Sequence, residues 1–241
     1  MKYVLVTGAS GDIGSACVKQ LAQNGYSIYC HYHTQKDKTE KLIHDLQNKY
    51  PKQDFFMVQA DLSKDSGLNQ ILQSIFQLDG LIFAHGGTSY NLLTELKPEE
   101  FDSMWQTHLK TPMLLCQNLQ TKLSTSRHGR IIFISSVYGL IGSSMEVLYS
   151  TLKGGQIAFA NAYAKEVATL GITVNTIAPG AVDTQMNTDW SLKEREELLD
   201  EIPLQRMALP DEIASLALYL LSENASYITG TSIPVTGGWK I

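Results

Sequence analysis

The chain alternates short apolar segments with longer segments of helical periodicity, and this alternation constrains its fold most. Short runs rich in β-branched and aromatic residues predict strands at 3–6, 27–32, 54–58, 80–84, 130–135, 173–177 and 232–235. Helical periods between them predict helices at 13–24, 37–49, 66–76, 98–123, 148–169, 192–201 and 211–221. Runs such as 131–134 are apolar without interruption, as is typical of strands covered on both faces. The pattern predicts an α/β fold, a doubly wound parallel β-sheet flanked by helices on both faces.

Length and composition fit one domain, residues 1–241, with a large core, because 44% of the residues are apolar and only 18% are charged. The net charge of −5 and the absence of a lysine or arginine cluster exclude a nucleic-acid partner. No apolar run approaches the ~18 residues of a membrane span, so we expect a cytoplasmic protein without a membrane partner. Cys17, Cys30 and Cys116 lack metal-ligand spacing, and we predict buried thiols and no metal site.

In parallel sheets of this kind, ligands bind at the carboxyl ends of the strands. The first strand is followed there by a glycine-rich turn that opens the first helix and reads Thr7-Gly8-Ala9-Ser10-Gly11-Asp12-Ile13-Gly14. Glycines permit a tight turn and let backbone N–H groups approach a pyrophosphate, which the helix N-terminus favours. Asp12 is either a favourable acid in the first helical turn or a carboxylate close to cofactor phosphates. A turn displaced toward Gly11 would hold it away, and we predict dinucleotide binding.

The end of the second strand indicates which dinucleotide binds. An acid at this point would hold the ribose 2′-hydroxyl of NAD and repel the 2′-phosphate of NADP. The segment reads His31-Tyr32-His33-Thr34-Gln35-Lys36 and contains no acid. We therefore expect NADP(H) to be favoured over NAD(H), with His33 among its contacts.

A hydroxyl, a phenol and an ammonium follow the fifth predicted strand. Ser136 ends that strand, and Tyr149 and Lys153 share one face of the next helix because they are four residues apart. A free tyrosine has a pKa near 10, and an ammonium within ~4–6 Å lowers it. The set suits reduction of a ketone, in which a hydride is added to carbon and a proton to oxygen.

These motifs, together with Pro179-Gly180 and the ending Tyr227-Ile228-Thr229-Gly230, resemble the short-chain dehydrogenase/reductase family over essentially the whole chain. The resemblance implies a Rossmann-like fold. It also implies that Tyr149 is the general acid, that Ser136 hydrogen-bonds the carbonyl oxygen, and that Lys153 tunes the tyrosine and holds the nicotinamide ribose. The implied cofactor contacts are Gly8, Ser10, Gly11, Asp12, Ile13, Gly14, His33, Asp61, Leu62, His85, Gly86, Tyr149, Lys153, Pro179, Gly180, Val182 and Thr184. Asp61 corresponds to the family's acid beside the adenine, or is a turn or N-cap residue. Residues 185–203 correspond to a helical substrate lid.

The sequence departs from the family pattern at three places. Asp12 replaces the middle glycine of the turn, and Ala84-His85-Gly86-Gly87 replaces Asn-Asn-Ala-Gly after the fourth strand. His108 stands where the family has the asparagine of its proton relay. A histidine both donates and accepts, so His108 either serves a modified relay or is a satisfied buried histidine.

The sequence is compatible with two classes of substrate. The chain is similar to 3-oxoacyl-acyl-carrier-protein reductases, but of two basic carrier-docking positions only Arg127 is matched, and the other is Leu170. Glu146, three residues before Tyr149, suits a substrate ammonium, and its surroundings resemble elongation factor P 5-aminopentanone reductases. Alternatively, Glu146 lies at the rim of the pocket, in water. We therefore expect a ketone substrate carried on elongation factor P or, alternatively, on acyl carrier protein.

Two further expectations concern class and assembly. A non-catalytic NADP-binding regulator usually lacks the tyrosine or the lysine, and both are present. The family commonly forms homodimers or homotetramers, for which 98–123, 148–169 and 234–241 are suitable elements.

Overall fold

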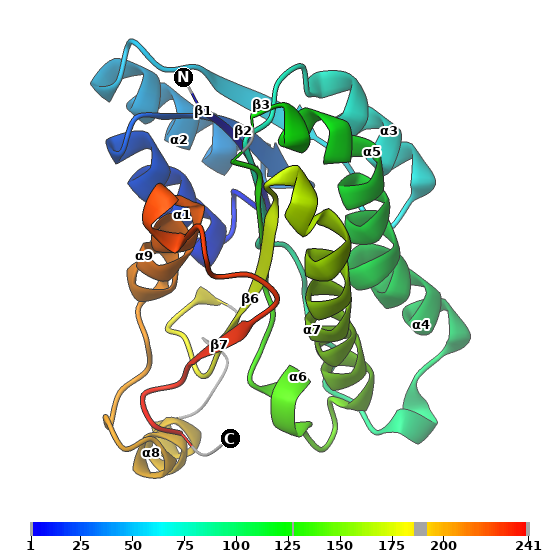
Figure 1. Cartoon of the computed structure of the whole chain (residues 1–241). Helices are drawn as coiled ribbons and strands as arrows, with labels where there is room; N and C mark the ends of the chain where they lie inside the picture. Colours follow the sequence, from blue (N-terminus) through cyan, green and yellow to red (C-terminus); the bar gives the residue numbers. More distant parts are fainter. Residues whose placement is uncertain (1, 127, 186–191, 240–241) are drawn as a thin grey trace.

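The computed structural model describes residues 2–126, 128–185 and 192–239, and its centre is a seven-stranded sheet in which every pairing is parallel (Figure 1). The strand order is β3-β2-β1-β4-β5-β6-β7. The strands are β1 (Lys2–Thr7), β2 (Tyr26–Tyr32), β3 (Phe55–Gln59), β4 (Gly80–Phe83), β5 (Arg130–Ile134), β6 (Thr173–Pro179) and β7 (Ser232–Val235). The predicted Rossmann-like fold is confirmed.

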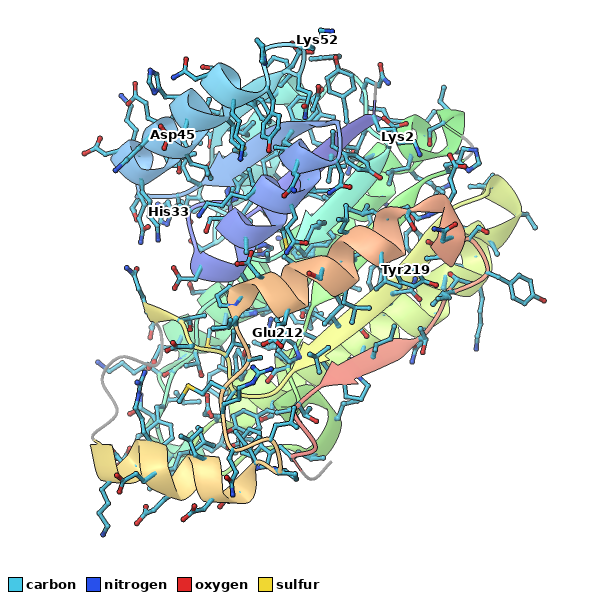
Figure 2. The ribbon with its side chains drawn as sticks, turned by 90° about the vertical axis from the view of Figure 1, so that its left-hand side faces the viewer. Lys2, His33, Asp45, Lys52, Glu212 and Tyr219 are labelled. Carbon is cyan, nitrogen blue, oxygen red and sulfur yellow. The ribbon has the colours of Figure 1, made fainter. Side chains whose placement is uncertain are left out.

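Helices cover both faces of the sheet. One layer contains α1 (Asp12–Gln23), α2 (Lys36–Lys49) and α9 (Pro210–Leu221), and the other contains α3 (Asp65–Ser74), α5 (Thr111–Thr125) and α7 (Val147–Val167). Figure 2 looks onto α1 and α9 in front of the sheet. Successive strand residues point to opposite faces, so Val4 and Val6 pack into the first layer and Leu5 into the second, all fully buried.

Shorter helices lie near the carboxyl ends of the strands. In Figure 1, α6 (Tyr138–Ile141) and α8 (Leu192–Glu201) lie below the sheet, beyond the ends of β5 and β6. The four-residue α6 was not predicted, because one helical turn is too short to show a period. Single turns of 3₁₀-helix occur at Leu93–Glu95, Ala168–Leu170 and Glu223–Ala225. Within the described part of the chain, no helix is both long and apolar enough to cross a membrane.

The predicted continuous helix 98–123 is wrong in its middle. It consists of α4 (Pro98–Trp105), a π-helical turn (Gln106–Lys110) and α5. The N–H of Thr111 bonds the carbonyl of Gln106, five residues back. Pro112 has no N–H, so the carbonyl of His108, four residues before it, cannot receive the usual helical bond. The break therefore frees one main-chain carbonyl beside α7.

The strand order reverses between β1 and β4, which are neighbours in the sheet. From β1 the sheet continues to β2 and β3 on one side, and from β4 it continues to β5, β6 and β7 on the other. At such a switch point the loops after the two strands diverge and leave a crevice for a ligand. The glycine-rich turn follows β1 there, and Ala84–Gly87 follows β4.

Candidate active site

Two glycines of the glycine-rich turn are required by close contacts within the protein. Gly8 has φ of 70°, and a Cβ on it would lie 2.7 Å from the Cα of His85. A Cβ on Gly14 would overlap the carbonyl of Gly8. Gly11, the N-cap residue of α1, has no side chain to cap the helix, which leaves its first N–H groups for a ligand phosphate.

The Asp12 carboxylate is held by two partners from other segments. One of its oxygens accepts a hydrogen bond from the N–H of Gln185 at 2.7 Å, and the other lies 3.5 Å from the ammonium of Lys38. These partners orient the carboxylate toward the segment after β6 and the start of α2. Asp12 thus joins the glycine-rich turn to the first residue of the predicted lid, of which 186–191 lie outside the described residues.

His31 and His33 have different environments although both end the second strand. His31 is buried, accepts a hydrogen bond from the N–H of Gly8 at 3.0 Å through Nδ1, and donates from Nε2 to the carbonyl of Ala60 at 3.1 Å. Burial lowers the pKa of His31 to about 4, so it is neutral and supports the turn. His33 is exposed at the edge of the molecule (Figure 2), with Nε2 3.7 Å from Asp61.

Asp61 is a turn residue in the structure. It accepts hydrogen bonds from the N–H and the hydroxyl of Ser63, at 3.0 and 2.6 Å, and pairs with Lys64 at 3.0 Å. The Ser63 hydrogen bond is the main reason that the pKa of Asp61 is lowered to about 2. Because α3 begins at Asp65, Asp61 is not its N-cap. Contact of Asp61 and Leu62 with the adenine stays a prediction.

His85 ties together the elements around the switch point. Its Nδ1 lies 2.6 Å from the hydroxyl of Thr7, and its Nε2 lies 2.8 Å from the carbonyl of Thr107. The carbonyl can only accept, so Nε2 carries the proton and Nδ1 accepts from Thr7. Burial lowers the pKa of His85 to about 3, which keeps the ring neutral. The side chain is thus used within the protein.

The structure brings the four predicted catalytic side chains together. Ser136, which follows β5, accepts from the N–H of Tyr138 at 3.2 Å, and its hydroxyl lies near enough to the phenol of Tyr149, in the first turn of α7, to lower the pKa of that phenol. The ammonium of Lys153 lies 5.6 Å from the Tyr149 ring centroid, is 4% exposed, and donates to the carbonyl of Ile134 at 2.8 Å. The His108 ring packs edge-on against Tyr149 with centroids 5.9 Å apart.

Burial dominates the electrostatics of this set. It raises the pKa of Tyr149 to about 12, an effect that the Ser136 hydrogen bond opposes and the Glu146 carboxylate reinforces. Burial also lowers the pKa of Lys153 to about 7. The phenol is therefore protonated at neutral pH, and the lysine is close to its titration point, where a ligand oxygen would favour the charged ammonium.

His108 is buried, but only one of its two ring nitrogens has a hydrogen-bond partner. It is 2% exposed, its Nε2 donates to the carbonyl of Gly87 at 3.0 Å, and its Nδ1 has no hydrogen-bond partner. Burial is the main reason that its pKa lies well below 6.5. A Cβ on Gly86 would lie 2.7 Å from the ring, so a glycine makes room for it. A relay role for the side chain stays a prediction.

The predicted nicotinamide contacts lie at the carboxyl end of β6. The carbonyl of Pro179 accepts from the N–H of Val137 at 2.8 Å, and the N–H of Gly180 donates to Val235 at 3.0 Å. Val182 forms an isolated bridge with Ala208, and Thr184 follows. The first of these bonds fixes this segment next to the turn that carries Ser136, and its contact with nicotinamide stays a prediction.

Glu146 is the N-cap residue of α7 and lies near enough to the phenol of Tyr149 to raise its pKa. Its carboxylate accepts from the hydroxyl of Thr88 at 2.6 Å. Met145 before it has φ of 61°, a strained conformation, and its carbonyl accepts from the N–H of Asn91 at 2.9 Å. The loop after β4 thereby holds Glu146 in place.

Sequence reasoning missed four side chains at this site: Thr88, Tyr138, Gln156 and Trp239. Tyr138 packs against Trp239 with ring centroids 6.1 Å apart, and burial, followed by Glu146, raises the Tyr138 pKa. Nothing local in the sequence links the C-terminal tryptophan to α6. Gln156 had a visible signal, since it is a polar residue on the face of α7 that carries Lys153.

Comparison with known proteins identifies the family. Residues 8–240 match the family described as Enoyl-(Acyl carrier protein) reductase. The uncharacterized oxidoreductase YmfI of Bacillus subtilis (strain 168) is 41% identical over 239 residues, 99% of this chain and 98% of that protein. The 3-oxoacyl-acyl-carrier-protein reductase FabG of Staphylococcus epidermidis (strain ATCC 35984) is 33% identical, with 98% of both chains covered. The structure of YwfH, an NADPH dependent reductase involved in bacilysin biosynthesis, superposes with a TM-score of 0.92 at 25% identity, covering 99% of this chain and 98% of that one.

These matches span the whole sheet and the site. The protein is a nicotinamide-dependent oxidoreductase. It belongs to the short-chain dehydrogenase/reductase family.

The burial of Lys153 predicts a specific dependence of stability on pH. The unfolded chain keeps the lysine proton up to a pKa of 10.5, whereas the folded protein releases it from about pH 7. Between these values the unfolded state binds more protons, so the stability of the wild type rises with pH. We expect the Tm of the cofactor-free wild type to rise relative to that of Lys153→Met from about pH 7 to about pH 9. Thermal melts of both proteins measure the difference.

Lys165→Met, on the exposed side of the same helix, is the control and should keep the wild-type slope. Parallel Tm curves for the wild type and Lys153→Met would show that folding does not perturb this lysine.

Proposed function

We propose that the protein is an NADPH-dependent reductase of a ketone whose substrate carries a primary amine. The observation that carries the reductase chemistry is the joint placement of Ser136, Tyr149 and Lys153 at the end of β5. The cofactor supplies a hydride to the carbonyl carbon when it is bound. The side chains have the other half of the reaction to perform, which is to polarise the carbonyl oxygen and protonate it.

Each residue has a separate role in that half. The hydroxyl of Ser136 hydrogen-bonds the carbonyl oxygen and orients it toward the phenol. Tyr149 donates its proton to the oxygen as the C–O double bond becomes single, and the phenolate left behind is stabilised by the ammonium of Lys153. The same ammonium has a donor left for a ribose hydroxyl, because it has three protons and its strongest internal bond, to Ile134, takes one.

Three observations support NADPH as the reductant. The end of β2 carries no acid, and the exposed His33 stands where an acid would repel a 2′-phosphate. Lys38 lies at the edge of the glycine-rich turn, 3.5 Å from Asp12. The structural relative YwfH is itself described as NADPH dependent.

The amine preference rests on Glu146. Its carboxylate is three residues before Tyr149 on α7, raises the pKa of that phenol, and takes part in none of the ion pairs found among the described residues. An ammonium bound there would be a short chain length from a ketone bound at Tyr149. We propose the 5-aminopentanone group on modified elongation factor P as the substrate, since it joins both groups in one side chain.

The cavity next to Glu146 agrees with a cationic substrate. About 390 Å³ in volume, it is lined by Thr88, the hydrogen-bond partner of Glu146, and by His108, Glu99 and Glu100. At the wall of this cavity, Glu100 accepts hydrogen bonds from the hydroxyl of Ser89 and the N–H of Lys97. An acyl chain gains nothing from these carboxylates, whereas an amine does.

Reduction of 3-oxoacyl groups on acyl carrier protein is the second candidate, favoured by the FabG relative. The basic docking surface that it requires is weak. Leu170 is an exposed leucine, Lys110 is paired with Asp65 at 3.0 Å, and Lys122 donates to the carbonyl of Phe76. Arg127 lies outside the described residues.

We propose a cytoplasmic homodimer or homotetramer built through α4, α5 and α7, since Phe101 and Trp105 expose their rings on α4. Residues 1–241 form one catalytic domain. A purely regulatory role is disfavoured because the phenol and the ammonium are both in place.

Removal of the proposed proton donor should abolish most of the turnover. Tyr149→Phe keeps the ring that packs on His108 but removes the proton, so turnover should fall by roughly 10²–10⁴-fold while NADPH still binds. NADPH and NADH oxidation with a panel of ketones measures the rate, and protein-enhanced NADPH fluorescence measures binding. Tyr163→Phe, on the opposite end of α7, is the control. Retention of turnover in Tyr149→Phe would overturn the proposed chemistry.

A further prediction concerns the amine. An amino-pentanone and the hexanone in which a methyl group replaces the amine differ only in charge at the far end. Glu146→Gln removes the negative charge but keeps the side-chain shape and should raise the KM for the amino-ketone by about 10-fold or more, leaving the neutral ketone unchanged. Glu166→Gln, on the exposed side of α7, should change neither.

An equal effect of Glu146→Gln on both ketones would contradict amine recognition. Faster reduction of an acetoacetyl thioester than of the amino-ketone by the wild type would favour the acyl-carrier reading instead.

A further inference from the structure

The carbonyl freed by the π-helical turn has a side-chain partner. Pro112 offers no N–H to the carbonyl of His108, and a buried carbonyl without a partner is costly. The side chain of Gln156 on α7 fills this place, with its Nε2 donating to the His108 carbonyl at 2.9 Å. A single amide thus repairs the defect that proline creates in the neighbouring helix.

The other end of the same amide reaches the lysine of the active site. Oε1 of Gln156 accepts from the ammonium of Lys153 at 3.4 Å, and Gln156 is 1% exposed. Lys153 also donates to the carbonyl of Ile134 at 2.8 Å. These two acceptors leave one of the three ammonium protons for a ligand.

The amide has only one favourable orientation. If it were rotated by half a turn, its NH₂ group would face the Lys153 ammonium and its oxygen would face the His108 carbonyl, with repulsion at both ends. The donor at one end and the acceptor at the other therefore fix the side chain. A hydrocarbon of the same size would fill the space without serving either neighbour.

We infer that Gln156 is a positioning residue for the reaction, whose amide holds the Lys153 ammonium against the π-helical turn and favours its charged state. The inference rests on the proposed roles of Tyr149 and Lys153. Burial lowers the pKa of Lys153, and the group that opposes this effect is a neutral amide oxygen rather than a carboxylate. A carboxylate would bind the ammonium tightly and compete with the cofactor ribose for its last proton.

The test compares two variants of similar size across pH. Ketone reduction by the wild type should fall as pH rises and Lys153 loses its proton. Gln156→Met removes the acceptor, so this fall should begin about one pH unit lower. Gln156→Glu places an anion beside the ammonium, so the fall should begin at least about one pH unit higher. The dependence of kcat/KM on pH measures both shifts.

The matched control is Gln120→Met. Gln120 accepts a hydrogen bond from Tyr163 at 2.9 Å and thus also joins α5 to α7, but away from the lysine. It should lower the Tm without moving the pH profile. If Gln156→Met and Gln156→Glu likewise lower the Tm and leave the profile where the wild type has it, Gln156 is only structural and the inference is wrong.

A second readout separates this inference from the proposed reaction. NADPH affinity can be followed by fluorescence across pH without a substrate. Because Lys153 is proposed to contact the cofactor ribose, the affinity should depend on the protonation state of this lysine. Opposite shifts of the affinity profile in the two variants would support the inference even if no ketone tested is reduced. Unmoved affinity profiles in both variants would overturn it, and Gln156→Glu decides the matter if the methionine variant does not fold.

Discussion

The site depends on a buried ammonium that is satisfied by neutral oxygens. Lys153 is 4% exposed, and its partners are the carbonyl of Ile134 and the amide oxygen of Gln156. A charge out of water is costly unless it is hydrogen-bonded, so the end of β5 and the start of α7 are fixed relative to each other by this lysine. That arrangement also places Ser136, which follows β5, against Tyr149 on α7.

Two neutral histidines, His31 and His85, connect the segments around the glycine-rich turn. His31 supports the glycine-rich turn from beneath, and His85 links β1 to the π-helical turn through Thr7 and Thr107. Burial keeps both rings uncharged, with pKa values of about 4 and about 3. An uncharged imidazole can donate at one nitrogen and accept at the other. His31 thereby connects Gly8 with Ala60, and His85 connects Thr7 with Thr107.

The sequence was sufficient to predict the sheet and the placement of Lys153 beside Tyr149, for different reasons. Runs such as 131–134 have no solvated face, as is typical of a strand in a sheet covered on both sides, and the structure has that sheet. Tyr149 and Lys153 are local to one helix, where a spacing of four fixes their relation. Contacts between distant segments had no such signature. The bond of Asp12 to Gln185 and the packing of Trp239 on Tyr138 depend on how loops meet in space. The π-helical turn had a signal in Pro112, but the partner of the freed carbonyl lies 48 residues from His108.

We propose that Lys153 makes Tyr149 an effective acid only when cofactor oxygens favour the charged ammonium. In the free protein, burial holds the pKa of the phenol at about 12 and that of the lysine at about 7. Ultraviolet absorbance of tyrosinate, taken as the difference between the wild type and Tyr149→Phe across pH, measures the phenol directly with and without NADP⁺. The account predicts that NADP⁺ lowers the Tyr149 pKa by at least about one unit. A phenol that titrates at the same pH in both states would contradict it.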